Sequence, residues 1–189
     1  MTKKKDMEKY EFRKQDKNFV LLYRRELTKL RKILPKRANI EHIGSSAVKG
    51  LGGKGLIDIV IAVPERGIGS AKNLLVKGGY EFIPDAGDKE RLFFFRDYAS
   101  KRGKRRVHLH LTPHNSKTFI GMVALRDYLI AHKDEARKYE EVKRKAVKIA
   151  KGNGKEYRRL KDQYLKRLTE KAVNIYEQSH GRSKFHSRI

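Results

Sequence analysis

The chain has 189 residues, which suffice for one domain with a hydrophobic core, and it contains no cysteine. The lack of cysteine excludes disulfides and cysteine-based zinc sites. No apolar signal segment or membrane-length run is visible, so we expect a cytoplasmic protein with no membrane contact. Its 47 lysines and arginines against 22 acidic residues give a formal net charge of +25, which favours polyanionic partners over basic ones.

The positive charge is concentrated in the two flanking segments of the chain. Residues 1–37 hold 14 basic and 5 acidic residues, a net of +9, and residues 141–189 hold 15 and 5, a net of +10. Two explanations are open: attraction to RNA or another polyanion, or a lysine-rich helical surface that is only solvated. The ends, 1–16 and 179–189, are polar and basic, and we expect flexible tails there.

The first half of the chain predicts helices alternating with strands. Apolar residues at helical spacing predict a helix that begins near Asp16 or Asn18 and ends before Pro35. A glycine-rich loop is predicted at 50–55. The other elements are strands at 39–43, 56–63 and 80–84 and a helix at 67–77.

The second half predicts a hairpin followed by helices. Strands at 91–98 and 105–112 are joined by a polar turn at 100–104, and alternation in the second strand puts His108 and His110 on one face. Helical spacing then predicts helices at 118–131, from a cap at Asp134 to the break at Gly152, and from about Tyr157 to Ile175.

These elements indicate an α+β fold. A mixed β-sheet core of four or five short strands occupies 17–113, and one crossover helix connects its strands. A helical C-terminal half at 114–178 packs on this core within the same domain. No internal repeat or low-complexity tract is visible, so a solenoid or a repeat array is excluded.

Asp58 is the first candidate functional residue. It lies in a β-branched run that otherwise has the pattern of a buried strand, where a carboxylate is costly unless it pairs with a base or a cation. His108 and His110 could ligate a metal or phosphate together, with His42 pointing to the same region; alternatively they are half-exposed histidines on a polar face. One carboxylate and two imidazoles suit Zn²⁺, Mn²⁺, Ni²⁺ or Fe²⁺ better than Mg²⁺.

The turn Gly44-Ser45-Ser46 is the second candidate feature. A glycine and two hydroxyls at the start of a short helix present N–H and O–H donors to an anion. A lone Gly-Ser pair is usually only a turn. The glycine-rich loop and Lys54 that follow favour the interpretation as a phosphate site.

A set of motifs also occurs in a fixed order over about residues 20–175. They are His42-Ile-Gly-Ser-Ser-Ala, Lys54-Gly-Leu-Ile-Asp-Ile, Glu90-Arg91-Leu-Phe-Phe, His108-Leu-His110, Leu125-Arg126-Asp127-Tyr128, Tyr139 with Lys143, and Tyr157 with Lys161. In this order they resemble the GrpB-like family, within the nucleotidyltransferase superfamily. The resemblance implies a nucleotidyltransferase-like sheet core with a helical C-terminal half.

The resemblance also implies roles for single residues. In active superfamily members a Gly-Ser turn holds a nucleoside triphosphate, two acids on the next strand hold Mg²⁺, and a later acid completes the site. Asp58 matches the first acid, but Val60 stands at the second position and His108 and His110 replace the third; Glu90 is a candidate substitute. The implied phosphate- or nucleotide-binding residues are Gly44, Ser45, Ser46, Lys54, Arg91, Arg126 and Lys143.

We therefore expect a protein that binds a nucleotide or another phosphorylated ligand, with a divalent metal (Mg, Mn or Zn) as candidate cofactor. Asp58 and Glu90 are the candidate catalytic residues, and metal-dependent nucleotidyl transfer is one activity that this set could support. Two alternatives stay open: a non-catalytic module that binds RNA or nucleotides, and a metal-dependent phosphohydrolase that uses the histidines as ligands.

Overall fold

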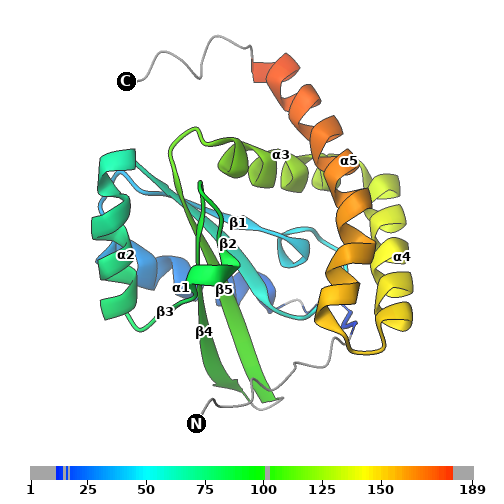
Figure 1. Cartoon of the computed structure of the whole chain (residues 1–189), viewed down its shortest axis with the longest axis horizontal. Helices are drawn as coiled ribbons and strands as arrows, with labels where there is room; N and C mark the ends of the chain where they lie inside the picture. Colours follow the sequence, from blue (N-terminus) through cyan, green and yellow to red (C-terminus); the bar gives the residue numbers. More distant parts are fainter. Residues whose placement is uncertain (1–11, 15, 17, 101–102, 181–189) are drawn as a thin grey trace.

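The computed structural model describes residues 12–14, 16, 18–100 and 103–180. At the centre of these residues is a five-stranded sheet in the order β1-β2-β5-β4-β3 (Figure 1). β2 and β5 are parallel, and the other neighbouring pairs in the sheet are antiparallel. The strands are β1 (Asn39–Ile43), β2 (Ile57–Val63), β3 (Glu81–Phe82), β4 (Leu92–Ser100) and β5 (Gly103–Pro113).

Helices cover both faces of this sheet. In Figure 1, α1 and α2 lie toward one face, and α3, α4 and α5 lie toward the other. Their bounds are α1 (Phe19–Ile33), α2 (Ile68–Lys77), α3 (Lys117–Ala131), α4 (Lys133–Ala150) and α5 (Gly154–His180). The mixed sheet with a helical C-terminal half confirms the α+β fold class predicted from the sequence.

The central strand β2 packs against a different layer on each side. Ile59 and Ile61 are fully buried in the main core, which α1 and α2 cover. Val60 points to the opposite face and packs against Val123 and Phe119 of α3. Because side chains alternate along a strand and both faces are covered, the run is apolar at nearly every position.

The three C-terminal helices share a second hydrophobic cluster. Tyr128 of α3, Tyr139 of α4 and Leu168 of α5 pack together with Val48 and Leu51, which lie between β1 and β2. This cluster fixes the helical half to the segment that follows the Gly-Ser turn. It therefore positions α4 next to the turn.

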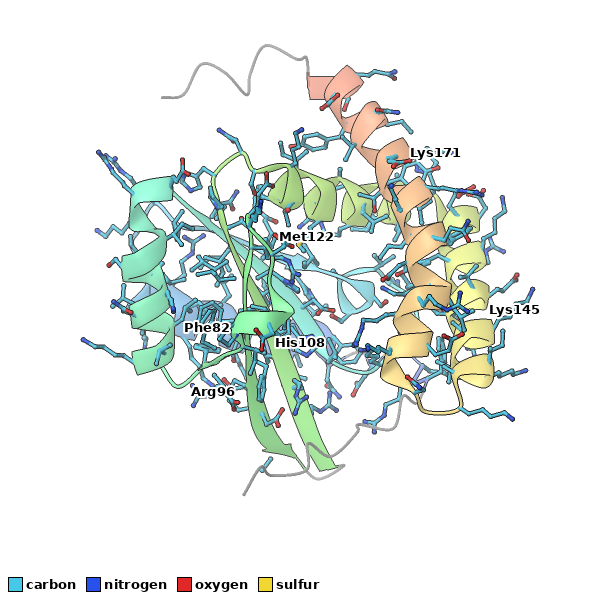
Figure 2. The ribbon with its side chains drawn as sticks, viewed as in Figure 1. Phe82, Arg96, His108, Met122, Lys145 and Lys171 are labelled. Carbon is cyan, nitrogen blue, oxygen red and sulfur yellow. The ribbon has the colours of Figure 1, made fainter. Side chains whose placement is uncertain are left out.

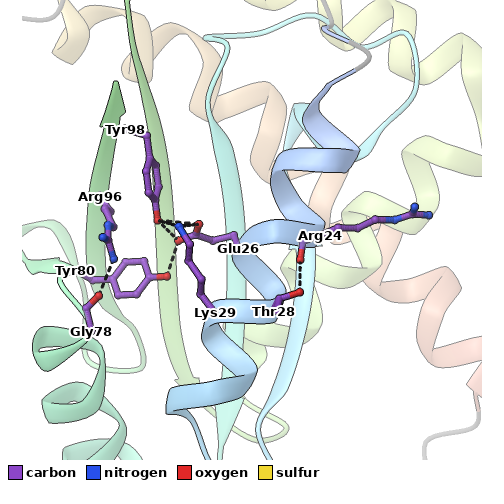
Figure 3. A network of polar contacts seen from close by, with 8 residues as sticks. All are labelled: Arg24, Glu26, Thr28, Lys29, Gly78, Tyr80, Arg96 and Tyr98. Carbon is purple, nitrogen blue, oxygen red and sulfur yellow. Dashed lines mark hydrogen bonds and ion pairs between the residues drawn. The ribbon is translucent and has the colours of Figure 1, made fainter. Parts of the chain in front are cut away.

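A polar network joins α1 to the edge of the sheet (Figure 3). Glu26 of α1 is buried and accepts hydrogen bonds from the hydroxyls of Tyr80 and Tyr98. Lys29 Nζ lies 3.7 Å from Glu26 Oε2 and donates to the Tyr98 hydroxyl at 3.1 Å. Burial and the Glu26 carboxylate raise the pKa of both tyrosines, so their hydroxyls remain donors at neutral pH.

Several element boundaries differ from the sequence-based expectation. α4 begins at Lys133 after His132, so the predicted cap Asp134 lies in the first helical turn instead. There its carboxylate faces the N-terminal end of the helix dipole. α5 continues to His180 and includes Ser179. The strand predicted at 80–84 is paired only over two residues, Glu81 and Phe82.

Most of the two predicted tails, residues 1–11 and 181–189, lies outside the described residues. Inside the first predicted tail, 1–16, Arg13 is described and pairs with Gly53 through two backbone hydrogen bonds of 2.7 and 2.9 Å, so this part of the tail contacts the core. Within the part of the chain that the structure describes, no helix is long and apolar enough to cross a bilayer.

Candidate functional site

The candidate site begins where β1 ends, because the turn after Ile43 lies against Asp58 of β2. Ile43 and Asp58 are partners in the antiparallel register. Gly44 has a φ of 71°, and a β-carbon placed there would lie 2.5 Å from Asp58 Oδ2. Glycine at this position supplies both the left-handed conformation and the space for the carboxylate.

Asp58, His108 and His110 come together on one face of the sheet. The parallel pairing of β2 and β5 sets Asp58 opposite His108 and Val60 opposite His110. His108 Nδ1 donates to Asp58 Oδ1 at 3.2 Å, and His110 Nε2 lies 3.8 Å from the same oxygen. Burial alone would raise the pKa of Asp58, but the hydrogen bond from His108 and the nearby His110 ring hold that pKa well below its ordinary value. Asp58 is therefore ionised.

Arg91 approaches His110 from the turn before β4. Its Nη1 lies 2.9 Å from His110 Nδ1, while Nε donates to Asp88 and Nη2 donates to the carbonyl of Ala86. Because a guanidinium can only donate, His110 Nδ1 must accept, and the proton of the neutral ring sits on Nε2, facing Asp58. Burial lowers the pKa of His110, which keeps the ring neutral.

In this arrangement Asp58, His108 and His110 are not positioned as a set of metal ligands. Among the described residues, no group of three His, Cys, Asp or Glu side chains is positioned to hold a metal ion. A metal on His110 Nε2 would require a proton on Nδ1, where the Arg91 guanidinium donates, so Arg91 would have to withdraw. Metal binding by Asp58, His108 and His110 stays a prediction.

Lys143 of α4 reaches the Gly-Ser turn from the helical side. The residue is 2% exposed, and its Nζ donates to Ser45 Oγ at 2.8 Å and to the carbonyl of Gly52. The ring centroid of Tyr139 lies 4.7 Å from Nζ. Burial lowers the pKa of Lys143 to about 7, so the amine titrates near neutral pH.

The glycine-rich loop is held on two sides by protein groups. The N–H of Gly52 donates to Glu140 Oε2 at 2.8 Å, and the N–H of Gly53 donates to the Arg13 carbonyl at 2.9 Å. These two N–H groups already have acceptors in the structure. Phosphate binding by the glycine-rich loop stays a prediction.

His42 and Ser46 bond to each other instead of to the Asp58 cluster. His42 Nε2 and Ser46 Oγ share a hydrogen bond of 3.0 Å, and Ser46 is buried. The His42 ring stacks on Tyr23 with a centroid separation of 4.5 Å. Burial lowers the pKa of His42 to about 4, so the ring is neutral near pH 7. The hydrogen bond between His42 and Ser46 stabilises the turn Gly44-Ser45-Ser46.

The remaining predicted ligand residues have other contacts. Arg126 bonds to Glu41 and Asp127, both at 2.7 Å, and to the His42 carbonyl, which ties α3 to β1. Lys54 Nζ lies 5.7 Å from the ring centroid of Tyr157. Glu90 is exposed and accepts from Thr118 at 3.3 Å. These contacts do not bring the three residues to Asp58.

Val60 stands where a second acid would be needed for a two-metal site. It shares a sheet face with Asp58, as strand alternation predicts, but α3 covers it and it is 0% exposed. An acid at this position would be enclosed by Val123, Phe119 and Ile43. Val60 therefore lies on the sheet face that strand alternation predicts, but its side chain is closed off from solvent.

Sequence reasoning does not identify Glu140 or Arg13, which hold the glycine-rich loop. Glu140 is 88 positions from its partner Gly52, and nothing in its local pattern separates it from the other charged residues of α4. Arg13 acts through its backbone carbonyl, which carries no side-chain signature. Both contacts become visible only when the tertiary structure is known.

The fold and the site define an α+β protein whose polar cluster lies on the sheet face shared with its helical C-terminal half. The chain belongs to the GrpB family, because a family model described as "GrpB protein" matches residues 9–171. This confirms the family that the ordered motifs predict.

Curated relatives and solved structures are consistent with this membership. A UPF0157 protein of Pseudomonas aeruginosa is 30% identical over 139 residues, which are 71% of this chain and 55% of that protein. One from Streptomyces coelicolor is 29% identical, covering 68% and 66%. The chain thus spans less than two thirds of the length of these relatives.

Among solved structures, GrpB of Enterococcus faecalis aligns with a TM-score of 0.76 and 23% identity, over 88% of this chain and 99% of that chain. This match shows that the two share a fold. The Cid1 poly(U) polymerase, solved with MgGTP, aligns over 61% of this chain and 38% of its own at a TM-score of 0.41 and 18% identity. Similarity at that level carries no functional argument.

Proposed function

We propose that this protein binds a nucleotide or another phosphorylated ligand beside Ser45, with Lys143 and Arg91 as its cationic contacts. The observation that carries the proposal is Lys143. Its amine is buried, and its two hydrogen bonds go to neutral oxygens, the Ser45 hydroxyl and the Gly52 carbonyl. A buried ammonium is stabilised most by an anionic partner, and a phosphate group would supply one.

The hydrogen-bond donors around Asp58 support the same class of ligand. The charges balance, because Asp58 and Asp88, which accepts from Arg91 Nε at 3.1 Å, contribute two negative charges, Arg91 and protonated Lys143 contribute two positive charges, and His110 is neutral. Arg91 uses three N–H groups in its bonds to Asp88, His110 and Ala86, out of the five that a guanidinium carries. Arg91 and Lys143 can therefore donate hydrogen bonds to an anion, and neither can accept one.

We propose ligand binding, and not nucleotidyl transfer, as the function of this site. Two-metal transfer requires carboxylates that bridge both cations, and Asp58 is the acid on β2 that faces the site, whereas Val60 is covered by α3. The proposal does not depend on a metal, since among the described residues no three His, Cys, Asp or Glu side chains form a group that could hold one. Rapid transfer from a labelled nucleoside triphosphate by the wild type would show that another acid, such as Glu90, substitutes.

Calorimetric titration with ATP and with inorganic triphosphate tests the proposal. We expect binding by the wild type and a loss of about 1–2 kcal/mol in Ser45→Ala, the range for a hydrogen bond to a charged group. At pH 8, binding should take up protons, because a phosphate near Lys143 raises its pKa from about 7. Lys143→Met should abolish that uptake. Absence of binding to either compound by the wild type would refute the proposal.

A second candidate, RNA binding, is favoured by the charge of the helical half. Lys145 on α4 projects outward in Figure 2 and is exposed, as is Lys148 on the same helix. Log K for single-stranded RNA should then fall with log salt by about 0.7 per neutralised phosphate. Lys145→Gln with Lys148→Gln should flatten that slope. If the wild type does not retain RNA at low salt, these lysines form a solvated surface and do not bind RNA.

A further inference from the structure

Two phenylalanines of β4 lie on the same sheet face as the Asp58 cluster. Phe94, between them, is 0% exposed in the main core. Phe93 and Phe95 point the other way, and their register partners on β5 are His110 and His108. Both are half-buried, and neither belongs to a hydrophobic cluster formed by the described residues.

The contacts of these two rings are with polar side chains. The Phe93 ring centroid lies 4.9 Å from that of His108 and 5.4 Å from that of His110, both edge-on. Arg106 lies over Phe95, with its Cζ 4.5 Å from the ring centroid. Asp97 fixes that guanidinium with two bonds of 2.7 and 2.8 Å. Phe93, Phe95 and Arg106 thus form a strip of aromatic and cationic groups beside His108, which Figure 2 labels on β5.

Such a strip suits a planar, polarisable group with an attached negative charge. Nucleobases stack on aromatic rings and on arginine planes, whereas a phosphate or a sugar does not. Arg106 is held in place before any ligand arrives, so less conformational entropy is lost when a ring stacks on it. The acidic partner Asp97 is neutralised by the same contact.

The distance between this strip and Ser45 fits a nucleotide with a phosphate chain. Ser45 follows the end of β1, and Phe95 lies on β4, so β2 and β5 lie between them. Three strand spacings amount to about 14 Å. An extended nucleoside di- or triphosphate covers a distance of this order, with the base at one end and the terminal phosphate at the other.

We propose that Phe93, Phe95 and Arg106 form the base-stacking surface of the ligand whose phosphates lie at Ser45 and Lys143. This inference rests on the proposed function and narrows it, because it makes the ligand a nucleoside polyphosphate rather than a phosphorylated compound without a base. Phe95 and Arg106 supply the stacking planes, and Phe93 orients the two histidines at the edge of the phosphate site.

The test compares ATP with inorganic triphosphate, which has the same phosphate chain and no base. Phe95→Leu keeps the apolar character of the side chain and removes the aromatic plane, and Arg106→Lys keeps the charge and removes the guanidinium plane. Each should weaken ATP binding by roughly 5- to 100-fold, the effect of one lost stacking contact, and leave triphosphate binding unchanged. Phe82→Leu, on the core side of the sheet, is the matched control and should change neither affinity.

The outcomes separate this inference from the function on which it rests. If the wild type binds ATP no more tightly than triphosphate, or if Phe95→Leu lowers both affinities equally, stacking is refuted while phosphate binding stands. If ATP affinity is the same in the wild type, Phe95→Leu and Arg106→Lys, the strip is a structural surface only. If the wild type binds neither compound, the proposed function fails, and this inference fails with it.

Discussion

Lys143 and Ser45, 98 positions apart in the chain, are joined by a hydrogen bond of 2.8 Å that ties α4 to the turn after β1. The bond places a titratable amine in a buried position at the junction of the sheet and the helical half. Its protonation state therefore affects the stability of the whole junction as well as any ligand bound there.

Stability should rise with pH between about pH 7.5 and 9.5 because of Lys143. The folded-state pKa is about 7 and the ordinary value is 10.5, so in this window the unfolded chain binds more protons than the folded chain. One proton gives a slope of up to about 1.4 kcal/mol per pH unit. Urea unfolding of the wild type and of Lys143→Met across this window measures it, and the variant should lose the slope.

The titration of His42, Tyr80 and Tyr98 sets the limits of this pH window. Below it, the lowered pKa of His42 gives its own rise in stability between about pH 4 and 6.5. Above it, the raised pKa of Tyr80 and Tyr98 lowers stability, because these tyrosines ionise only in the unfolded chain. An identical slope in the wild type and Lys143→Met between these limits would show that the amine is not buried in solution.

Gly44→Ala should disrupt the site more than its single methyl group suggests. The residue has φ 71° and ψ −169°, a backbone region populated essentially only by glycine, which costs about 1–3 kcal/mol for another residue, and the added carbon would lie 2.5 Å from Asp58 Oδ2. Asp58 must shift to accommodate it. Gly69→Ala is the control, since nothing lies within 4 Å of the corresponding position. Equal melting temperatures for the two variants would contradict this account.

Ser46→Ala should destabilise the fold by about 1–3 kcal/mol, because His42 Nε2 would lose its partner in a buried position. Urea unfolding measures the change. In His42→Phe the ring still stacks on Tyr23, so combining it with Ser46→Ala should recover part of the loss. Additive effects in this double-mutant cycle would mean that the two side chains do not interact.

Removal of Arg91 should strengthen binding of Mn²⁺ or Zn²⁺ at Asp58. In the wild type, the guanidinium fixes the His110 proton on the nitrogen that faces Asp58, and Arg91→Gln would release it. Burial lowers the pKa of His110, so competition between the metal and a proton at this ring should begin only below its ordinary pKa of 6.5. Calorimetry of Arg91→Gln with and without His110→Ala tests this. A metal affinity unaffected by either substitution would place the ion elsewhere.

The sequence predicts the sheet face of the site but not its chemistry. Strand alternation and the run of β-branched residues in β2 are local signals, and they predict which face of each strand carries Asp58 and His108; the pairing of β2 with β5 puts both on one face of the sheet. The tautomer of His110 depends on Arg91, which reaches it from a turn 19 positions away. The acceptor for the Gly52 N–H is Glu140 of α4, and the periodicity of a sequence carries no information about a contact over 88 positions. Long-range contacts of this kind decide which donors remain for a ligand.

The parallel pairing of β2 with β5 also fixes when a newly made chain can acquire its site. Asp58 and His108 are 50 positions apart, and Lys143 follows 35 positions after His108. If the protein binds its ligand as proposed, a ribosome-bound chain that has not yet exposed α4 lacks Lys143 and should not bind that ligand. Ligand capture by nascent or truncated chains would thus serve as a direct readout of the moment at which the helical half docks on the sheet.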